Sequence, residues 1–285
     1  MRFQFAKKVF LFASIFTLVV ALSACTKKLS VLKDPNITLS TTTSLNDSGL
    51  LEYLNPLLLK ETGIKMDIVS QGTGAAIKTA TDGNADVIFV HAKAQEEKFV
   101  TDGFGLQRIE LMSNYFVIVG PKNDPAKVKG SSLTASLAFA KIYASGFKFV
   151  SRGDASGTNT KELALWKAAS ITPKGDIYVS AGKGMGDVLT MTSELQGYTL
   201  TDKATYLAMK DKLDLQIVVN ESTDLLNQYT IIEVNPVKWP ATNSAAVKVF
   251  IDWMTSKKTL DRIAAYGKDK YGEALFFIND GTATK

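Results

Sequence analysis

The sequence has few of the side chains that catalytic and metal sites usually need, with one cysteine and one histidine among its 285 residues. A single cysteine excludes an intramolecular disulfide. One cysteine and one histidine are too few for the common zinc sites, which combine several such ligands. The sequence also lacks a Gly-x-Ser-x-Gly elbow, a Walker-type phosphate loop and a Gly-x-Gly-x-x-Gly dinucleotide motif. We therefore expect no metal site and no enzyme, and we expect the lone histidine, His91, to be structural.

A large charge of one sign is also missing once the N-terminus is set apart. The net charge is +5, and Arg2, Lys7 and Lys8 contribute three of these charges without an acid nearby, which leaves +2 for the rest. A near-neutral chain gives no electrostatic case for binding nucleic acid. The composition, 46% hydrophobic and 21% charged, is that of a globular protein with one large domain or two smaller ones.

The most apolar stretch, residues 9–22, is shorter than the roughly 20 residues that a membrane helix needs. It follows a basic start and precedes Leu22-Ser23-Ala24-Cys25, a sequence that resembles a bacterial lipobox. We predict a signal peptide over residues 1–24, lipidation at Cys25 and a tether over residues 25–36. The domain would then lie at the outer face of a bacterial membrane, the periplasmic face where an outer membrane exists. An ordinary signal peptide with a chance cysteine is the alternative.

Strand-like and helix-like segments alternate along the rest of the chain, which predicts an α/β fold with two mostly parallel sheets. The pattern runs once, restarts after the apolar strand 113–121, and closes with a second long strand at 228–236. Two such crossings indicate two lobes with a hinge and a cleft. We expect residues 37–116 and 232–285 in lobe I and residues 117–231 in lobe II.

Four loops share one design, in which a strand ends, small hydroxyl or glycine residues follow, and a helix begins. In α/β sheets these turns lie where ligands bind. A helix start offers unpaired N–H groups and roughly half a positive charge, which suits an anion. Any one such loop can be a plain N-cap or turn, but four together favour a site. The loops are Ser40–Ser44, Gln71–Gly74, Ser151–Thr158 and Ser180–Gly186.

The segment Phe149–Glu162 contains the charged part of this pattern. Arg152 follows an apolar strand end, where its planar fork can bind an oxyanion. Asp154 is expected either to orient Arg152 through an ion pair or to cap a helix. Residues 156–158 then add hydroxyls and amides at a helix start. The alternative is a surface Arg–Asp pair, which would contribute little.

Taken in order, the motifs TTTS, GTGAAIKT, SRGDASGT and GMGDVLTM resemble those of the tungstate-binding proteins (TupA type) of bacterial tungstate ABC transporters. The resemblance runs from about Ile37 to the C-terminus. It implies a type II periplasmic-binding-protein fold that delivers tungstate to a membrane permease. The protein would act as a monomer, need no cofactor, and contact the membrane only through its N-terminal lipid.

The resemblance also implies which residues hold the oxyanion. Within the hydroxyl run it points to Thr42 and Ser44, with Thr43 as an alternative because the run leaves the assignment uncertain by one. The implied set is Thr42, Thr43, Ser44, Thr73, Arg152, Ser156, Gly157 and Thr158.

The chemistry of tungstate agrees with such a set of residues. Tungstate is a tetrahedral dianion without a proton near neutral pH, so it needs donors and offers none. Two other interpretations stay open: a binding protein for molybdate, phosphate or sulfate, and an adhesive surface lipoprotein with an incidental cleft.

Overall fold

The computed structural model describes residues 32–220 and 222–279. The predicted signal peptide, Cys25 and most of the predicted tether lie outside these ranges. From Asp34 onward the chain forms one compact unit. Within the two described ranges, no helix is long and apolar enough to cross a membrane.

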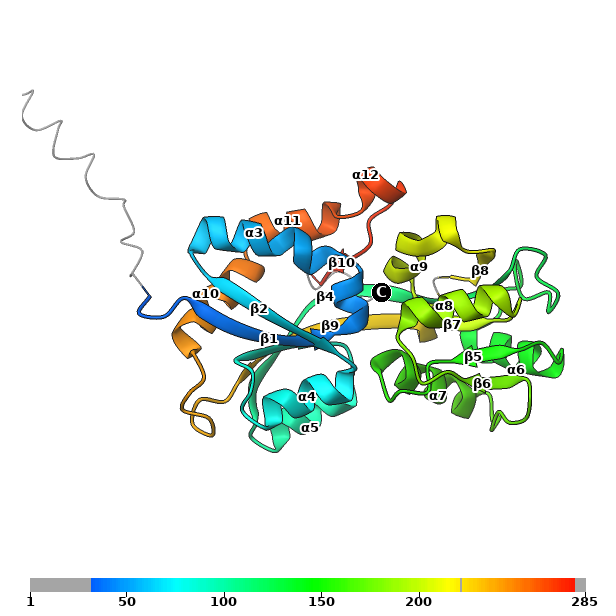
Figure 1. The fold of residues 1–285 in the computed structure, drawn as a ribbon, viewed down its shortest axis with the longest axis horizontal. Helices are drawn as coiled ribbons and strands as arrows, with labels where there is room; N and C mark the ends of the chain where they lie inside the picture. Colours follow the sequence, from blue (N-terminus) through cyan, green and yellow to red (C-terminus); the bar gives the residue numbers. More distant parts are fainter. Residues whose placement is uncertain (1–31, 221, 280–285) are drawn as a thin grey trace, which may run out of the picture. The chain divides into compact units, whose positions relative to one another are not determined.

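The larger sheet is built around the first strand of the domain. Its strand order is β10-β4-β9-β3-β1-β2 (Figure 1). The strands β2 and β3 flank β1 and run parallel to it, whereas β9 runs antiparallel to β3 and β4 antiparallel to β9. The bounds are β1 (Asn36–Thr42), β2 (Lys65–Gln71), β3 (Val87–Val90), β4 (Gly105–Pro121), β9 (Leu226–Val234) and β10 (Phe277–Ile278).

The long strand β4 belongs to two sheets. Its 17 residues pair first with β9 and then, further along, with β7 (Thr199–Asp202) and β8 (Leu215–Val219), both antiparallel. A short parallel pair, β5 (Phe149–Ser151) and β6 (Tyr178–Ser180), lies beyond. The expected α/β class is therefore present, but the sheets are mixed rather than mostly parallel. The reason is that the two crossing strands pair antiparallel with each other and with their neighbours.

Helices cover the sheets, and Figure 1 shows α4 and α5 on one face of the larger sheet with α3 and α11 on the other. The helices are α2 (Thr43–Asp47), α3 (Leu50–Thr62), α4 (Thr73–Thr81), α5 (Lys93–Thr101), α6 (Ala135–Ala144), α7 (Gly157–Ala168), α8 (Met185–Glu194), α9 (Lys203–Met209), α10 (Ser244–Met254), α11 (Lys257–Ala265) and α12 (Lys268–Tyr271), with short 3₁₀ turns at Lys210–Lys212 and Thr223–Leu225.

Helix α3 shows how the sequence specifies these elements. Its leucines at helical spacing, among them Leu51, Leu54 and Leu58, are buried, as the pattern predicts. The helix ends at Gly63, which has the left-handed conformation of a glycine C-cap. Pro56 lies inside the helix.

A cluster of buried aromatic and aliphatic side chains, around Trp166 and Tyr198, fills the space between α6, α7 and β4.

Residues 199–202 form strand β7 and are buried beside β4. One element differs from the sequence-based expectation of a strand over residues 113–121. Strand β4 begins at Gly105 rather than near Ser113, because residues 105–115 pair along β9. The division into lobes at residues 37–116 with 232–285, and 117–231, stays a prediction.

Candidate functional site

Three helices begin where strands end, and their first residues come close together. Helix α2 follows β1 directly, α4 follows β2 after one residue, and α7 follows β5 after the loop 152–156. Two contacts join the larger sheet to the α7 segment: Thr43 with Arg152, and Thr73 with Gly157. The predicted site residues of both segments are therefore gathered in one place.

The five hydroxyls of Ser40–Ser44 divide into different tasks. Ser40 and Thr41 donate to the carbonyl oxygens of Ala76 and Phe89 and so tie β1 to its neighbours. Thr42 caps α2, because its Oγ1 accepts from the amide of Leu45 at 3.3 Å. The remaining two, Thr43 and Ser44, lie in the first turn of α2.

Ser44 and Thr73 are buried hydroxyls that already take part in hydrogen bonds within the chain. The Ser44 hydroxyl lies 3.3 Å from Thr42 Oγ1 and 3.2 Å from His91 Nε2. Thr73 Oγ1 accepts from the amide of Gly157 at 3.1 Å. Because Thr73 accepts that bond, its own hydrogen stays free to donate. The N-cap of α4 is Gly72, which has no side chain to accept from the first amides of the helix. The N–H groups in the first turn of α4 therefore lack a side-chain cap.

Arg152 is the buried cation of the site, with 3% of its surface exposed. Its Nη2 donates to Asp154 Oδ2 at 2.5 Å and lies 3.5 Å from Thr43 Oγ1. Its Nε is buried and has no hydrogen-bond partner among the described residues. The expected ion pair with Asp154 is therefore present; its arginine is buried and its carboxylate is partly buried.

The start of α7 adds a second buried donor without a partner. Ser156 caps the helix by accepting from the amide of Asn159 at 3.2 Å. Asp154 Oδ1 accepts from the amide of Ser156 at 3.1 Å. The Thr158 hydroxyl is buried and pairs with no group in the described part of the chain. Unpaired buried donors are rare and costly, so Thr158 and the Nε of Arg152 indicate a place for an anionic guest.

A buried carboxylate behind Arg152 was not foreseen from the sequence. Glu162 accepts hydrogen bonds from Ser151 at 2.6 Å, from Tyr178 at 2.8 Å and from Trp166 at 3.0 Å. Burial raises the pKa of this carboxyl, while its donors oppose that rise. The network fixes the end of β5, the residue before Arg152, to helix α7.

His91, which the sequence led us to expect as a structural residue, contacts one of the candidate site residues, Ser44. It follows β3, its Nε2 contacts Ser44, and its ring centroid lies 4.9 Å from that of Tyr229. Burial, together with the charge of Arg152, lowers its pKa to about 4, so the ring is neutral near pH 7. A Cβ on Gly157 would stand 2.6 Å from His91 Cε1 and 2.8 Å from Thr73 Oγ1. Only glycine fits at this contact without a shift of its neighbours.

The fourth predicted loop, Ser180–Gly186, packs against the backbone of Arg152 and Gly153. The amide of Lys183 donates to the carbonyl oxygen of Arg152 at 3.3 Å. Gly153 has a φ of +60°, and a Cβ there would lie 2.0 Å from Ser180 Oγ. The loop therefore shapes the turn after Arg152. Its side chains do not belong to the expected ligand set.

The donors at the site suit an anion better than a metal ion. Among the described residues, no group of three or more histidine, cysteine, aspartate or glutamate side chains could hold a metal. The inner groups are a guanidinium, hydroxyls and helix-start amides. Their partial and full positive charges converge among buried side chains, where such donors act strongly on a negative guest.

Comparisons with known proteins agree with this chemistry. A model of the PBP superfamily domain matches residues 30–258. The tungstate-binding protein TupA of Peptoclostridium acidaminophilum is 48% identical over 274 residues, which cover 93% of this chain and 96% of that protein.

Two solved structures share both sequence and fold with the chain. The tungstate ABC transporter structure from Geobacter sulfurreducens is 48% identical, has a TM-score of 0.75 and covers 81% of this chain and 98% of its own. The tungstate-binding protein TupA from Desulfovibrio alaskensis G20 is 40% identical, also with a TM-score of 0.75, over 86% of this chain and 99% of its own.

Proposed function

We propose, from the premise that this chain belongs to the PBP superfamily and to the TupA family of tungstate-binding proteins, that it captures tungstate outside the cytoplasm and delivers it to the permease of an ABC transporter. The family consists of binding proteins and not enzymes, in agreement with the sequence-based expectation. The ligand residues, the delivery step and the membrane anchor are parts of this proposal.

One observation carries the proposal: two buried donors without partners among the described residues lie in the segment that meets the hydroxyl run of the larger sheet. These are Arg152 Nε and the Thr158 hydroxyl. The opposing side offers Thr43, which lies 3.5 Å from Arg152, and Thr73, which contacts Gly157. A tetrahedral dianion placed among these groups would satisfy both unpaired donors and receive hydrogen bonds from both sides.

The acceptors at the site favour an oxyanion that carries no proton. Both carboxylate oxygens of Asp154 already accept bonds, from Arg152 and from the amide of Ser156. Asp187, the other acid near the predicted loops, is exposed at the start of α8. Hydrogen phosphate would need an acceptor for its proton, whereas tungstate, molybdate and sulfate would not. The same argument leaves molybdate and sulfate as alternative ligands.

Binding would also strengthen the contact between the two sides of the site. The bond from Gly157 to Thr73 and the approach of Arg152 to Thr43 join segments 84 and 109 residues apart in the chain. A ligand that accepts donors from both segments stabilises the arrangement in which they meet, by its differential affinity for that state. The permease would then recognise this arrangement.

The N-terminal part of the proposal concerns residues outside the described ranges. Cleavage before Cys25 and lipidation of its thiol would hold the domain at the outer face of the cell membrane, close to the permease. A Cys25→Ser variant should then appear in the soluble fraction of cells rather than with the membrane.

Titration calorimetry with a panel of oxyanions at pH 7 tests the proposal. Tungstate should bind most tightly, molybdate next, and sulfate and phosphate at least about tenfold more weakly than tungstate. Preference for phosphate would show that the acceptor argument is wrong. Binding of none of the four would contradict the function and would favour the adhesive alternative.

A further inference from the structure

A cavity lies beside the candidate site. It has a volume of about 300 Å³, and its walls come from the start of α5, from α7 and from the beginning of β9. That volume is ten times the roughly 30 Å³ that one water occupies in the liquid. The cavity can therefore hold a small anion with part of its hydration shell.

The walls of this cavity carry positive charge that the protein leaves largely unpaired. Lys161 on α7 is half-buried, has no hydrogen bond or ion pair with another described residue, and burial lowers its pKa. Asp224 acts on it from a distance, and its oxygens are held by the amides of Ala135 and Ser136. Lys93 on α5 has only Glu97, at 3.9 Å and exposed, as a partner in the described part of the chain.

Two residues separate the cavity from the donors of the site. His91 and Gly157 line the cavity, and the same two residues contact Ser44 and Thr73 at the site. They come from opposite sides, His91 from the larger sheet and Gly157 from α7. If these two residues moved apart, the cavity and the site would become one space.

We propose that this cavity is an antechamber for tetrahedral oxyanion dianions, in which Lys93 and Lys161 collect the hydrated anion before it passes between His91 and Gly157 to the inner donors. The inference rests on the proposed function and adds a route to it. It assigns the two lysines a role in the rate of capture. Neither lysine is assigned a contact with the bound anion.

The physical consequence is a split between two rate constants. Cationic groups at the mouth of a site raise the association rate of an anion, and salt screens this effect. Groups that do not touch the bound ion leave its dissociation rate unchanged. A lysine that bound the anion directly would instead change dissociation, because its loss would weaken the complex itself.

The test uses the mature protein and sodium tungstate in stopped-flow mixing, followed by tryptophan fluorescence, with calorimetry for the dissociation constant. We expect the double variant Lys93→Gln/Lys161→Gln to associate about three- to tenfold more slowly at low ionic strength. Its dissociation rate should match that of wild type. The difference should shrink at about 0.5 M salt, where the screening length falls below about 5 Å. Lys161→Arg should keep the wild-type rate, since it keeps the charge.

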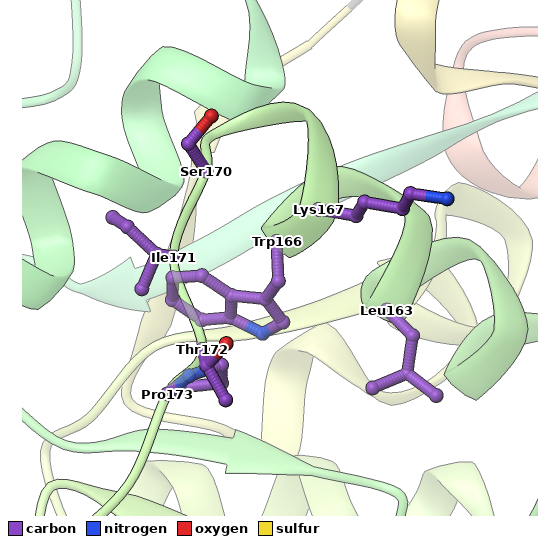
Figure 2. A pocket seen from close by; sticks show the side chains of 7 residues that line it. All are labelled: Leu163, Trp166, Lys167, Ser170, Ile171, Thr172 and Pro173. Carbon is purple, nitrogen blue, oxygen red and sulfur yellow. The ribbon is translucent and has the colours of Figure 1, made fainter.

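Lys167→Gln is the control for the Lys161 part of the double variant, because it removes one positive charge from the same helix. Figure 2 shows Lys167 beside a different hollow, which it lines together with Trp166 and Pro173. This variant should change the association rate by less than about twofold. An equal loss in the control would mean that net charge alone steers the anion, and it would overturn the antechamber.

The remaining outcomes are also distinct. An unchanged association rate in the double variant, or a loss that resides in the dissociation rate, would overturn the inference while wild-type binding leaves the proposed function intact. If wild-type protein does not bind tungstate, by calorimetry with the same sample, the proposed function fails first and the inference falls with it.

Discussion

The two sides of the candidate site differ in how far the protein itself satisfies the donors of the predicted ligand residues. His91 Nδ1, which is on the sheet side but outside that set, also has no partner among the described residues. On the side of the larger sheet, the hydroxyls of Thr42, Ser44 and Thr73 each take part in a hydrogen bond within the chain. On the side of α7, Arg152 Nε and the Thr158 hydroxyl are buried and have no partner among the residues that the structure describes.

This difference separates two contributions to binding. In the proposed site, the larger sheet would provide a scaffold whose hydroxyls are oriented before the ligand arrives, which lowers the ordering cost of binding. The α7 segment would provide donors whose hydrogen bonds form only with the ligand. Substitutions on the α7 side should therefore change affinity more than stability, and substitutions on the sheet side should change both.

Arg152→Ala should cause the largest loss. It removes the full positive charge at the site and leaves a buried dianion without its counter-ion, which costs about 3–4 kcal/mol, or roughly a 100- to 1,000-fold weaker tungstate complex. Calorimetry measures the change. Arg152→Lys keeps the charge but loses the planar fork, so its affinity for tungstate should lie between those of wild type and Arg152→Ala. Wild-type affinity in Arg152→Ala would place the site elsewhere.

The neutral state of His91 should make stability depend on pH. Its pKa is about 4 in the folded protein and about 6.5 when unfolded. Its stabilising contribution is complete above about pH 6.5 and is lost as the pH falls to about 4, by up to about 3 kcal/mol. Urea unfolding at several pH values should show this loss in wild type and not in His91→Gln. Parallel curves for the two proteins would contradict a lowered pKa.

Gly157→Ala should disturb the contact between the two sides. The new Cβ would press against His91 Cε1 and Thr73 Oγ1, and such overpacking costs about 1–3 kcal/mol. We expect a roughly tenfold weaker tungstate complex. Gly184→Ala is the control, because Gly184 also lies at the start of a helix and its Cβ would meet nothing within 4 Å. Equal losses in both variants would show that the close approach does not matter.

Thr158→Val and Thr42→Val should separate affinity from stability. Thr158→Val removes an unpaired buried hydroxyl, so it should weaken tungstate binding about fivefold to tenfold while leaving the melting temperature unchanged or higher. Thr42→Val removes the cap of α2 and should lower stability by about 1 kcal/mol. Calorimetry and thermal melts measure both. A lower melting temperature in Thr158→Val would mean that its hydroxyl has a structural partner.

Local patterns predicted much of the fold and the segments that meet at the candidate site. Leucine spacing predicted α3, Gly63 predicted its end, and the strand–loop–helix pattern predicted the segments around Thr43 and Arg152. These features depend on neighbours within a few residues. The convergence of the loops followed from a general property of α/β sheets, since helix starts gather at strand ends.

Contacts between distant segments were not predictable in the same way. His91 meets Ser44, 47 residues away, and no local pattern marks that pairing. The antiparallel strands around β4 and β9 have the same apolar composition as parallel ones, so the sequence did not reveal their direction. Glu162 looked like one more polar residue on a helix, although the folded chain buries it and this burial raises its pKa.

Strand β4 has a further consequence for how the domain melts. Because one continuous strand supplies hydrogen bonds to both sheets, neither sheet can lose its order without stripping partners from the other. Heating should therefore disrupt both halves in a single cooperative transition. An anion held by residues of either half would delay the collapse of the whole.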